Sequence, residues 1–317
     1  MEPDSPETKT ILITSIGCAP ASAIARTLFT NTNRKSKYYI IGIDIQEECV
    51  GNFITDKYIK CPRITDINYW EFIYNLIKEY KITHIFPTYN TEIIEWSRKK
   101  VYLENSLNCV VIVNDIELIN IADNKLETYE WCCNNNINIP RIKLITERPI
   151  IIKPINGCGS NGIKILKTYE ENDDSIEYIN SNYIIQEFIK GTEYTIDIIA
   201  DTNGKVINVI PKERLLIKNG QSFKSITRND NELINFAKKC SILLGNKSVI
   251  NIQVIRDNAG KIYLIEINPR FPTTIGLTIK SGVNIPVMLV EKDFETREFI
   301  NNLVMIRDYQ EYFMIKE

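Results

Sequence analysis

The chain has 317 residues, of which 44% are hydrophobic and 25% are charged, as is typical of a soluble globular protein with two or three packed units. Its 38 basic and 40 acidic residues leave a formal net charge of -2 without blocks of like charge, which argues against nucleic acid or a membrane surface as partner and favours small molecules. The N-terminus, MEPDSPETKT, is polar, and no run approaches the roughly 18 to 20 apolar residues of a membrane span, so we expect a cytoplasmic protein.

Strand-like and helix-like segments alternate through the first 115 residues. KTILI, YYIIGIDI, HIF and VVIV read as strands, and ASAIARTLF and WEFIYNLIKEY read as helices. This order predicts an α/β domain with an open, mostly parallel sheet over residues 1–115. The first turn, SIGCAPAS, lacks G-x-G-x-x-G, which argues against nicotinamide binding.

Polar residues follow the third strand-like run, at Thr88, Asn90 and Glu92. Ligands bind open α/β sheets at the carboxyl ends of the strands, so these residues are either pocket residues or part of a plain loop. His84, the only histidine, is interpreted as a structural, hydrogen-bonded residue. The eight cysteines form no C-x-x-C pair, which predicts reduced thiols and argues against a zinc site.

The segment ELINIADNKLETYEWCCNNNINIP predicts two short helices, with Asp123 as an N-cap, and an asparagine-rich turn before Pro140. We expect a second domain to begin here.

A glycine-rich loop then joins two strand-like runs in RPIIIKPINGCGSNGIKIL. Exposed backbone N–H groups in such a loop suit either a hairpin turn or a phosphate cradle. Lys153, in the apolar run before the loop, would be costly to bury as an unpaired ammonium, and a phosphate would compensate it. This favours the cradle, whose residues are Gly157, Gly159, Ser160, Asn161 and Gly162.

Polar residues also recur on one face of the later strands. One strand ends in Gln186 and Glu187, and the next places Glu193, Thr195 and Asp197 on the same side.

The run VINIQVIRDNAGKIYLIEINPR predicts a hairpin around the turn DNAG. If Arg256 pairs with Lys261, then Gln253 lies opposite Leu264 and Asn251 opposite Glu266. Burial of the apolar face favours this register over a slip of one residue. The polar face then holds Asn251, Gln253, Glu266 and Asn268, and the apolar face holds Ile250, Ile252, Val254, Ile265 and Ile267.

One carboxylate among neutral amides suits a hard cation such as Mg²⁺, which completes its coordination with phosphate oxygens and water. Arg270, next in the row, would meet a transferring phosphoryl group or an anionic intermediate. Taken alone, the hairpin is equally consistent with a solvated face.

Several motifs together resemble the ATP-grasp superfamily, and are most similar to its carbamoyl-phosphate-synthetase-like proteins. They are, in order, ADNK, IIKP, NGCGSNGI, QEFIKGTEYTIDI, PKERLLIKNGQS, INIQ and IEINPRF. The resemblance covers nearly the whole chain, and IEINPRF with QEFIKGTEY is its most specific part. It implies an α+β ATP-grasp fold after the α/β domain, with the nucleotide between two antiparallel sheets, a small subdomain over residues 116–188 and a C-terminal subdomain over residues 189–317.

The resemblance also implies roles for the matching residues. Glu187 and the backbone of Phe188 and Ile189 would read the adenine edge, and Glu193 would hold the ribose hydroxyls. The full nucleotide set is Lys125, Lys153, Gly157, Gly159, Ser160, Asn161, Gly162, Gln186, Glu187, Phe188, Ile189 and Glu193. Mg²⁺, with Mn²⁺ as an alternative, would bind Gln253, Glu266 and Asn268, and the catalytic residues would be Arg214 and Arg270.

The implied activity is an ATP-dependent ligase that activates a carboxylate as an acyl phosphate for attack by an amine. A nucleotide-binding regulatory module and a kinase-like enzyme that releases a phosphorylated product are the alternatives. Where the family often has small residues after N-P-R, this chain has FPTTIG, so the acceptor pocket differs and the substrates stay open. A single such unit argues against carbamoyl-phosphate synthesis by this chain alone, and a homodimer is neither favoured nor excluded.

Overall fold

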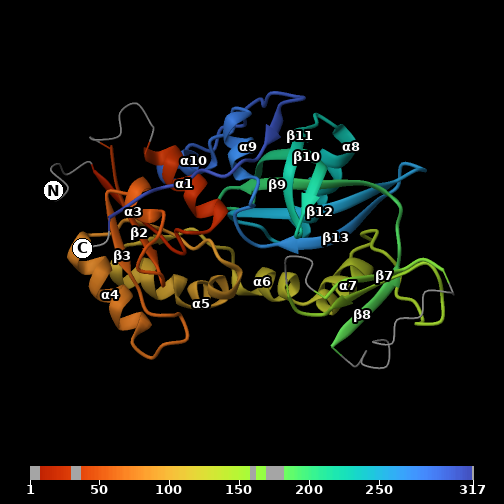
Figure 1. Cartoon of the computed structure of the whole chain (residues 1–317), viewed down its shortest axis with the longest axis horizontal. Helices are drawn as coiled ribbons and strands as arrows, with labels where there is room; N and C mark the ends of the chain where they lie inside the picture. Colours follow the sequence, from red (N-terminus) through yellow and green to blue (C-terminus); the bar gives the residue numbers. More distant parts are fainter. Residues whose placement is uncertain (1–7, 30–36, 158–161, 169–181, 316–317) are drawn as a thin grey trace.

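The computed structural model describes residues 8–29, 37–157, 162–168 and 182–315, and arranges them around three β-sheets. A five-stranded sheet lies in the N-terminal part, a six-stranded sheet in the C-terminal part, and a three-stranded sheet at the end far from the N-terminus (Figure 1). The predicted boundaries after residues 115 and 188 fall between these sheets, and we propose them as the domain boundaries.

The N-terminal sheet is parallel throughout, with the strand order β3-β2-β1-β4-β5. Ile11, Leu12 and Ile41 have no exposed surface, because both faces of its central strands are covered, as is usual for parallel sheets. The predicted mostly parallel sheet is confirmed. Its strands are β1 (Lys9–Ile13), β2 (Tyr38–Asp44), β3 (Lys57–Lys60), β4 (His84–Phe86) and β5 (Val110–Val111).

Helix α5 begins at Asn90, within the polar stretch that contains Thr88, Asn90 and Glu92. From the sequence, these residues were either pocket residues or part of a plain loop. Its first turn buries Glu92, whose carboxylate accepts hydrogen bonds from Thr14 Oγ1 at 2.6 Å and from the Tyr89 N–H at 3.1 Å. Glu92 therefore fixes the helix start and lines none of the three cavities described below. The helices of this unit are α1 (Ala19–Phe29), α3 (Gly51–Ile54), α4 (Tyr69–Tyr80) and α5 (Asn90–Leu107).

Helices α6 (Ile116–Asp123) and α7 (Lys125–Asn134) link the two halves of the molecule. The predicted N-cap, Asp123, is wrong: Asp123 ends α6, and Asn124 caps α7 by accepting from the Leu126 N–H at 2.8 Å. Aspartate and asparagine cap helices about equally well, so the sequence alone did not distinguish the two neighbours.

The three-stranded sheet is antiparallel, with the order β7-β6-β8. It consists of β6 (Ile150–Pro154), β7 (Lys164–Leu166) and β8 (Tyr183–Glu187), and β6 and β7 are the two strands predicted to flank the glycine-rich loop.

The six-stranded sheet is antiparallel as well, with the order β13-β12-β9-β10-β11-β14. Helix α8 (Asn231–Leu243) covers one face with Leu233, Ala237 and Cys240, so polar side chains gather on the other. The two antiparallel sheets of the predicted α+β fold are thus confirmed. The strands are β9 (Gly191–Ala200), β10 (Val206–Lys218), β11 (Gln221–Thr227), β12 (Val249–Asp257), β13 (Ile262–Asn268) and β14 (Val304–Ile306).

The predicted register of the β12–β13 hairpin is wrong by one residue, and a bulge changes it again. Arg256 pairs with Ile262, and a shift at Ile265 then brings Gln253 opposite Glu266 and Asn251 opposite Asn268. A bulge adds one residue to one strand and reverses which face its side chains take. Leu264 is therefore buried, whereas Ile265, expected in the core, lines the cavities described below.

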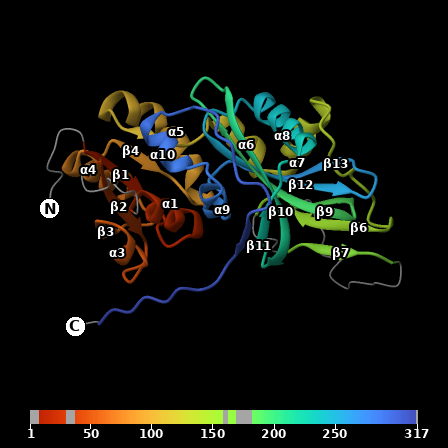
Figure 2. The ribbon, with the colours of Figure 1, turned by 90° about the horizontal axis from the view of Figure 1, so that it is seen from above.

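One apolar cluster joins the N-terminal unit to the C-terminal part. It includes Ile24 and Leu28 of α1 together with Ile275 of α9 (Ile275–Lys280) and Met288 of α10 (Ile285–Glu291). Beyond β14 the chain runs back toward the N-terminal unit (Figure 2), where the ring of Tyr312 lies 5.0 Å from that of Phe53. The two parts are thus packed against each other. No helix in the described ranges is long and apolar enough to cross a lipid bilayer.

His84 is buried, and its Nδ1 lies 2.8 Å from Thr83 Oγ1, as expected of a structural histidine. Burial, helped by the charges of Lys9 and Lys292, lowers its pKa from 6.5 to about 4. The unfolded chain therefore binds more protons than the folded one between about pH 4 and 6.5, so stability falls as the pH drops through this window.

Replacing His84 by Gln should remove this acid sensitivity. A pKa difference of this size corresponds to about 3 kcal/mol, so the wild-type protein should lose about that much more unfolding free energy than the variant between pH 7 and pH 4. Urea unfolding at the two pH values measures it. Equal losses of unfolding free energy in the wild type and the variant would show that His84 is not the source of the acid sensitivity.

Candidate active site

A cavity of about 510 Å³ lies between the two antiparallel sheets. Helix α7, the sheet β7-β6-β8 and the strands β9, β10, β12 and β13 supply its walls. The predicted site residues that line it are Lys125, Lys153, Gly157, Glu187, Phe188, Ile189, Glu193, Arg214, Gln253 and Glu266. Gly159, Ser160 and Asn161 lie outside the described residues, while Gly162, which is described, does not line this cavity.

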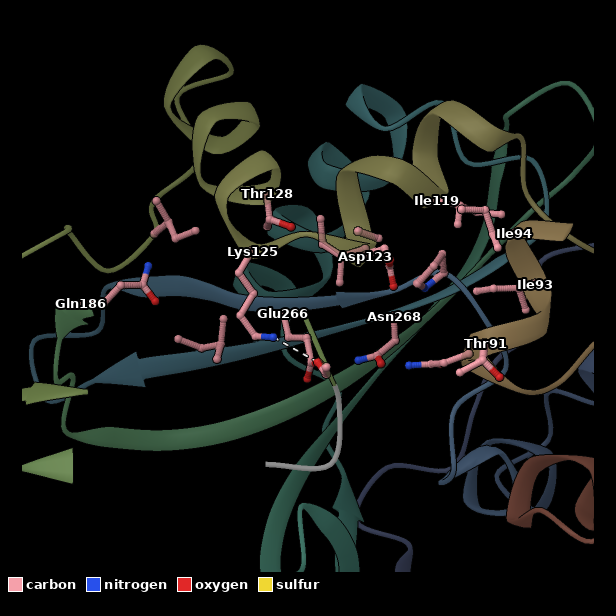
Figure 3. Close-up of a pocket in the computed structure, with 17 residues that line it drawn as sticks. Thr91, Ile93, Ile94, Ile119, Asp123, Lys125, Thr128, Gln186, Glu266 and Asn268 are labelled. Carbon is pink, nitrogen blue, oxygen red and sulfur yellow. Dashed lines mark hydrogen bonds between the residues drawn. The ribbon is translucent and has the colours of Figure 1, made fainter. Parts of the chain in front are cut away.

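A smaller cavity of about 270 Å³ adjoins it and opens toward α5, α6 and α7. Figure 3 shows Lys125, Glu266 and Asn268 side by side at its centre and Gln186 at one end. The Lys125 ammonium donates to the Gly157 carbonyl at 3.1 Å, which ties the start of α7 to the glycine-rich loop.

Lys153 lies on β6 and is only 4% exposed. Its ammonium donates to Gln186 Oε1 at 3.2 Å, and Gln186 Nε2 donates to the Pro140 carbonyl at 2.9 Å. Gln186 thus orients the lysine and itself faces the smaller cavity. Burial lowers the pKa of Lys153 from 10.5 to about 8, against the opposing charges of Glu266 and Glu193. Among the described residues its hydrogen-bond partner is the neutral Gln186, and a buried cation in such surroundings is well suited to an anionic ligand.

Nucleotide binding should therefore be accompanied by proton uptake at Lys153. At pH 8.5 most of the free protein carries this lysine neutral, and a bound phosphate favours its charged form, so roughly half a proton or more should be taken up. Calorimetric titration with Mg-ATP in two buffers of different ionisation enthalpy measures the uptake. Titration in the same two buffers at pH 6.5 is the control, because Lys153 is already protonated at that pH in the free protein. Identical heats in both buffers at pH 8.5 would exclude the linkage.

The Glu187 side chain is engaged by Arg141. Its carboxylate accepts from the Arg141 backbone N–H at 3.0 Å and from Arg141 Nη2 at 3.1 Å. Burial alone would raise the pKa of Glu187, but the Arg141 contacts outweigh it and lower the pKa. The Phe188 N–H donates to the Pro149 carbonyl. Of the three residues predicted to read an adenine edge, Ile189 is thus the one whose backbone we propose for that role.

Arg214 is almost fully buried in the cavity wall. Its guanidinium donates to Glu193 Oε2 at 3.1 Å, to Gln253 Oε1 at 2.9 Å and to Ser222 Oγ at 3.0 Å. Burial lowers its pKa, while Glu193 and then Glu266 counteract this. These contacts hold the cation beside the oxygen atoms predicted to bind metal.

Gln253 and Glu266 lie directly opposite each other on the hairpin, and Asn268 follows two residues later on the same face. One carboxylate and two amide oxygens fit Mg²⁺, which uses few protein ligands and takes the remainder from phosphate and water. Gln253 Oε1 and Asn268 Oδ1 each accept one hydrogen bond, from Arg214 and Arg270, and an amide oxygen keeps a second lone pair.

Arg270 connects this row to the N-terminal unit. Its guanidinium donates to Asn90 Oδ1 at the start of α5, to Asn268 Oδ1 at 3.1 Å and to the Phe271 carbonyl at 3.1 Å. Asn90 is the residue from the earlier unit that holds the arginine at the carboxyl end of β13.

A third cavity, of about 450 Å³, lies beyond Arg270 and is called here the acceptor cavity. Arg214, Gln253 and Glu266 line both this cavity and the larger one. Thr88 and Asn90 also line the acceptor cavity. Of the three polar residues considered as pocket residues from the sequence, these two therefore line a pocket, whereas Glu92 does not line this one. The other walls of the acceptor cavity come from the end of the β1–α1 loop and the start of α1 at residues 17–20, from the β10–β11 turn and the start of β11 at residues 220–222, and from the segment at residues 272–274.

A buried polar network beneath the acceptor cavity was not predicted from the sequence. Lys212 and Asp197 are both fully buried and form an ion pair, and Lys212 also donates to Thr274 Oγ1 at 2.9 Å. Asn251 Nδ2 donates to Asp197 Oδ1 at 2.9 Å. Burial lowers the pKa of Lys212, although Asp197 opposes this. Asn251 and Thr274 line the cavity, so the pair fixes two of its wall residues. The sequence placed Asp197 and Asn251 on polar strand faces, but it did not show that Lys212, which lies two residues before Arg214 and hence on the same face of β10, would meet them.

A parallel α/β unit followed by two antiparallel sheets around a cavity is the architecture of ATP-grasp proteins, and the comparisons agree. Residues 122–274 match the family model described as ATP-grasp domain, and residues 11–112 match that described as PylC-like, N-terminal domain. The chain therefore carries an ATP-grasp domain behind a PylC-like N-terminal domain.

Among curated relatives, the chain is 30% identical over 160 residues to the D-alanine–D-alanine ligase of Buchnera aphidicola, which covers 46% of this chain and 51% of that one. It is 30% identical over 163 residues to the carbamoyl phosphate synthase large chain of Clostridium perfringens, covering 45% of this chain and 15% of the other. The chain thus matches about half the length of the first relative and a small part of the second.

Among solved structures, the chain is similar to N5-carboxyaminoimidazole synthetase from Staphylococcus aureus complexed with ADP. The TM-score is 0.69 at 14% identity, over 96% of this chain and 83% of the other. At this identity the likeness shows the fold.

Proposed function

We propose that the chain is an ATP-dependent ligase that joins a carboxylate to an amine. A carboxylate oxygen attacks the γ-phosphorus of ATP and ADP leaves. The amine nitrogen then attacks the acyl carbon, phosphate leaves, the nitrogen loses its proton to solvent, and an amide remains.

The observation that carries this proposal is the junction of the two larger cavities. Arg214, Gln253 and Glu266 line both. A phosphate held in the largest of the three cavities and a carboxylate held in the acceptor cavity would therefore meet at these residues. Phosphoryl transfer requires an in-line acceptor and neutralisation of charge, and little covalent participation by the protein.

The residues divide between the two ligands. Lys125, Lys153 and the loop from Gly157 to Gly162 hold the phosphates, Ile189 contacts the adenine, and Glu193 binds the ribose. Gln253, Glu266 and Asn268 hold Mg²⁺ or Mn²⁺, which neutralises phosphate charge when bound. Arg270, fixed by Asn90 and Asn268, stabilises the negative charge of the acyl phosphate and of its transition state.

The similarity to a D-alanine–D-alanine ligase supports small carboxylate and amine substrates, because that relative's name describes the joining of two such molecules. The proposal needs no catalytic cysteine or histidine, which agrees with the structural role of the single histidine.

The test is Mg²⁺-dependent release of ADP from ATP, screened against pools of amino acids, peptides and other carboxylates, with and without added amines. A ligase requires both an acid and an amine for sustained release and yields an amide. Release that needs the acid alone would indicate a kinase-like enzyme, and tight ATP binding without release in any pool would favour the regulatory alternative.

A further inference from the structure

The smaller cavity is assigned to neither ATP nor the acid in the proposed function. Its volume is about 270 Å³, and isoleucine side chains from α5, α6, β13 and the segment after α7 form much of its wall. Such a wall offers water few hydrogen-bond partners, so an apolar group that displaces this water is bound favourably. The isoleucines are Ile93, Ile94, Ile119, Ile139, Ile265 and Ile267.

The smaller cavity borders the place where the acyl phosphate would form. Asn90, Glu266 and Asn268 line both this cavity and the acceptor cavity. The side chains of Asn90 and Asn268 also accept hydrogen bonds from Arg270. A nitrogen atom at this border would therefore lie beside the guanidinium proposed to stabilise the acyl phosphate.

The two cavities differ in the charge of their walls. Among the described residues, two arginines and Glu266 are the charged side chains of the acceptor cavity, whereas Asp123, Lys125 and Glu266 are those of the smaller cavity. The Lys125 ammonium donates to the Gly157 carbonyl and holds phosphate in the proposed function. The acceptor cavity therefore favours an anion, and the smaller cavity suits a cation better. A primary amine is such a cation at neutral pH.

Asp123 is the acidic residue of the smaller cavity outside the proposed metal site. It ends α6, where the helix dipole disfavours a negative charge, so helix stability does not account for it. No hydrogen bond or ion pair among the described residues includes its side chain. Figure 3 shows Asp123 above Asn268 in the wall of this cavity. The residue is exposed, so its carboxylate can attract an ammonium group that arrives from solvent.

We propose that the smaller cavity binds the amine substrate, with an aliphatic group among the isoleucines and the nitrogen directed toward Asn90 and Asn268. Asp123 attracts the amine in its ammonium form, which loses a proton to solvent before the nitrogen attacks. This inference rests on the proposed function and deepens it, because it assigns separate cavities to the acid and the amine. It narrows the second substrate to an amine that carries an aliphatic group.

The first test fills the cavity. Ala122 lines the smaller cavity and neither of the others, so the ring introduced by Ala122→Phe would occupy the space of an aliphatic group. ADP release is measured with Mg-ATP, the acid found in the screen, and isopentylamine as the probe. Because the apolar contact is lost, we expect KM for isopentylamine to rise about tenfold or more. An unchanged KM for isopentylamine would overturn the proposal.

Hydroxylamine is the comparison nucleophile for the same variant. It is small, is largely uncharged at neutral pH and reacts with acyl phosphates, so it needs no aliphatic site. In Ala122→Phe, ADP release with hydroxylamine should fall much less than release with isopentylamine. Equal losses with both nucleophiles would show that the variant damages the whole active site, and would also overturn the proposal.

A second variant, Asp123→Asn, tests the charge. Because Asp123 is exposed, we expect KM for isopentylamine to rise only about threefold, with little effect on release supported by hydroxylamine. Glu117→Gln is the matched control, since Glu117 is an exposed acid on the same helix and lines none of the three cavities. Equal effects of the two substitutions on KM would contradict the role of Asp123.

A binding measurement separates this inference from the proposed function. The thermal stability of the protein loaded with Mg-ADP is measured with isopentylamine and with isopentanol, its uncharged counterpart. Stabilisation by isopentylamine that is lost in Ala122→Phe supports the amine site even if the wild type releases no ADP with any pool and the proposed function fails. Absence of stabilisation of the wild type by isopentylamine would reject the amine site, even if the acid and hydroxylamine support ADP release.

Discussion

Replacement of Glu266 by Gln should lower Mg²⁺-dependent ADP release by about a thousandfold while leaving the fold intact. Glu266 supplies a carboxylate beside the amide side chains of Gln253 and Asn268, and it lines all three cavities. The variant keeps the size and an oxygen of the side chain but removes the negative charge that would attract a hard cation. The measurement is initial-rate ADP release at saturating Mg²⁺ and ATP, with circular dichroism as the check on folding.

Glu213→Gln is the control for Glu266. Glu213 belongs to β10 of the same sheet, but it pairs with Arg228 and lines none of the three cavities. Its replacement should change the rate by less than about twofold, because Glu213 lines none of the cavities and the loss of a partly exposed ion pair lowers the stability by about 1 kcal/mol or less. A Glu266→Gln variant that retained a substantial part of the wild-type rate would refute the metal assignment.

Replacement of Lys212 by Met should cost about 3 to 5 kcal/mol of unfolding free energy. Lys212 and Asp197 have no exposed surface, and the ammonium donates to Asp197, Thr274 and Thr278. Without the lysine, the Asp197 carboxylate stays buried among neutral donors, and this uncompensated charge is the main cost. Urea unfolding at pH 7 measures the loss. A loss below about 1 kcal/mol would show that water or a rearranged side chain compensates Asp197.

The double variant Lys212→Met, Asp197→Leu distinguishes the cost of an unpaired buried charge from the cost of altered side-chain packing. Removing both charges from a buried pair is often close to neutral, so the double variant should recover most of the stability that the single variant loses. Both variants also remove the Lys212 donor to Thr274, and the double variant removes one of the acceptors of Asn251 Nδ2. We therefore expect lower activity even in the double variant, since these two residues line the acceptor cavity.

The sequence predicted the elements that have strong local signals. The alternation of apolar strands and helices gave the parallel sheet, because both features depend on neighbouring residues. The four residues predicted to share the polar face of the β12–β13 hairpin, Asn251, Gln253, Glu266 and Asn268, do share it. The pairing of the hairpin was not predicted correctly, because the turn places Arg256 opposite Ile262 instead of Lys261, and a bulge at Ile265 then shifts the register again. Such a bulge depends on what packs against both faces and leaves no signal in the residue types.

The site residues show the same division. Lys153 was predicted as a site residue because a lysine within an apolar run is unusual. In the structure it is buried and lines the largest of the three cavities. The engagement of Glu187 by Arg141 could not be read from the sequence, since 46 residues separate them. Asn90 approaches the site from outside the residues that match the ATP-grasp domain, so only the packing of distant elements brings it to Arg270.

The proposed formation of an acyl phosphate is tested most directly by isotope transfer. Once the screen has identified an acid, it is supplied with ¹⁸O in its carboxylate, and the released phosphate is analysed by mass spectrometry. The mechanism proposed here predicts that each phosphate carries one ¹⁸O from the acid, because a carboxylate oxygen attacks the γ-phosphorus and remains on it when the amine displaces phosphate. Phosphate that contains no ¹⁸O while the amide accumulates would contradict it.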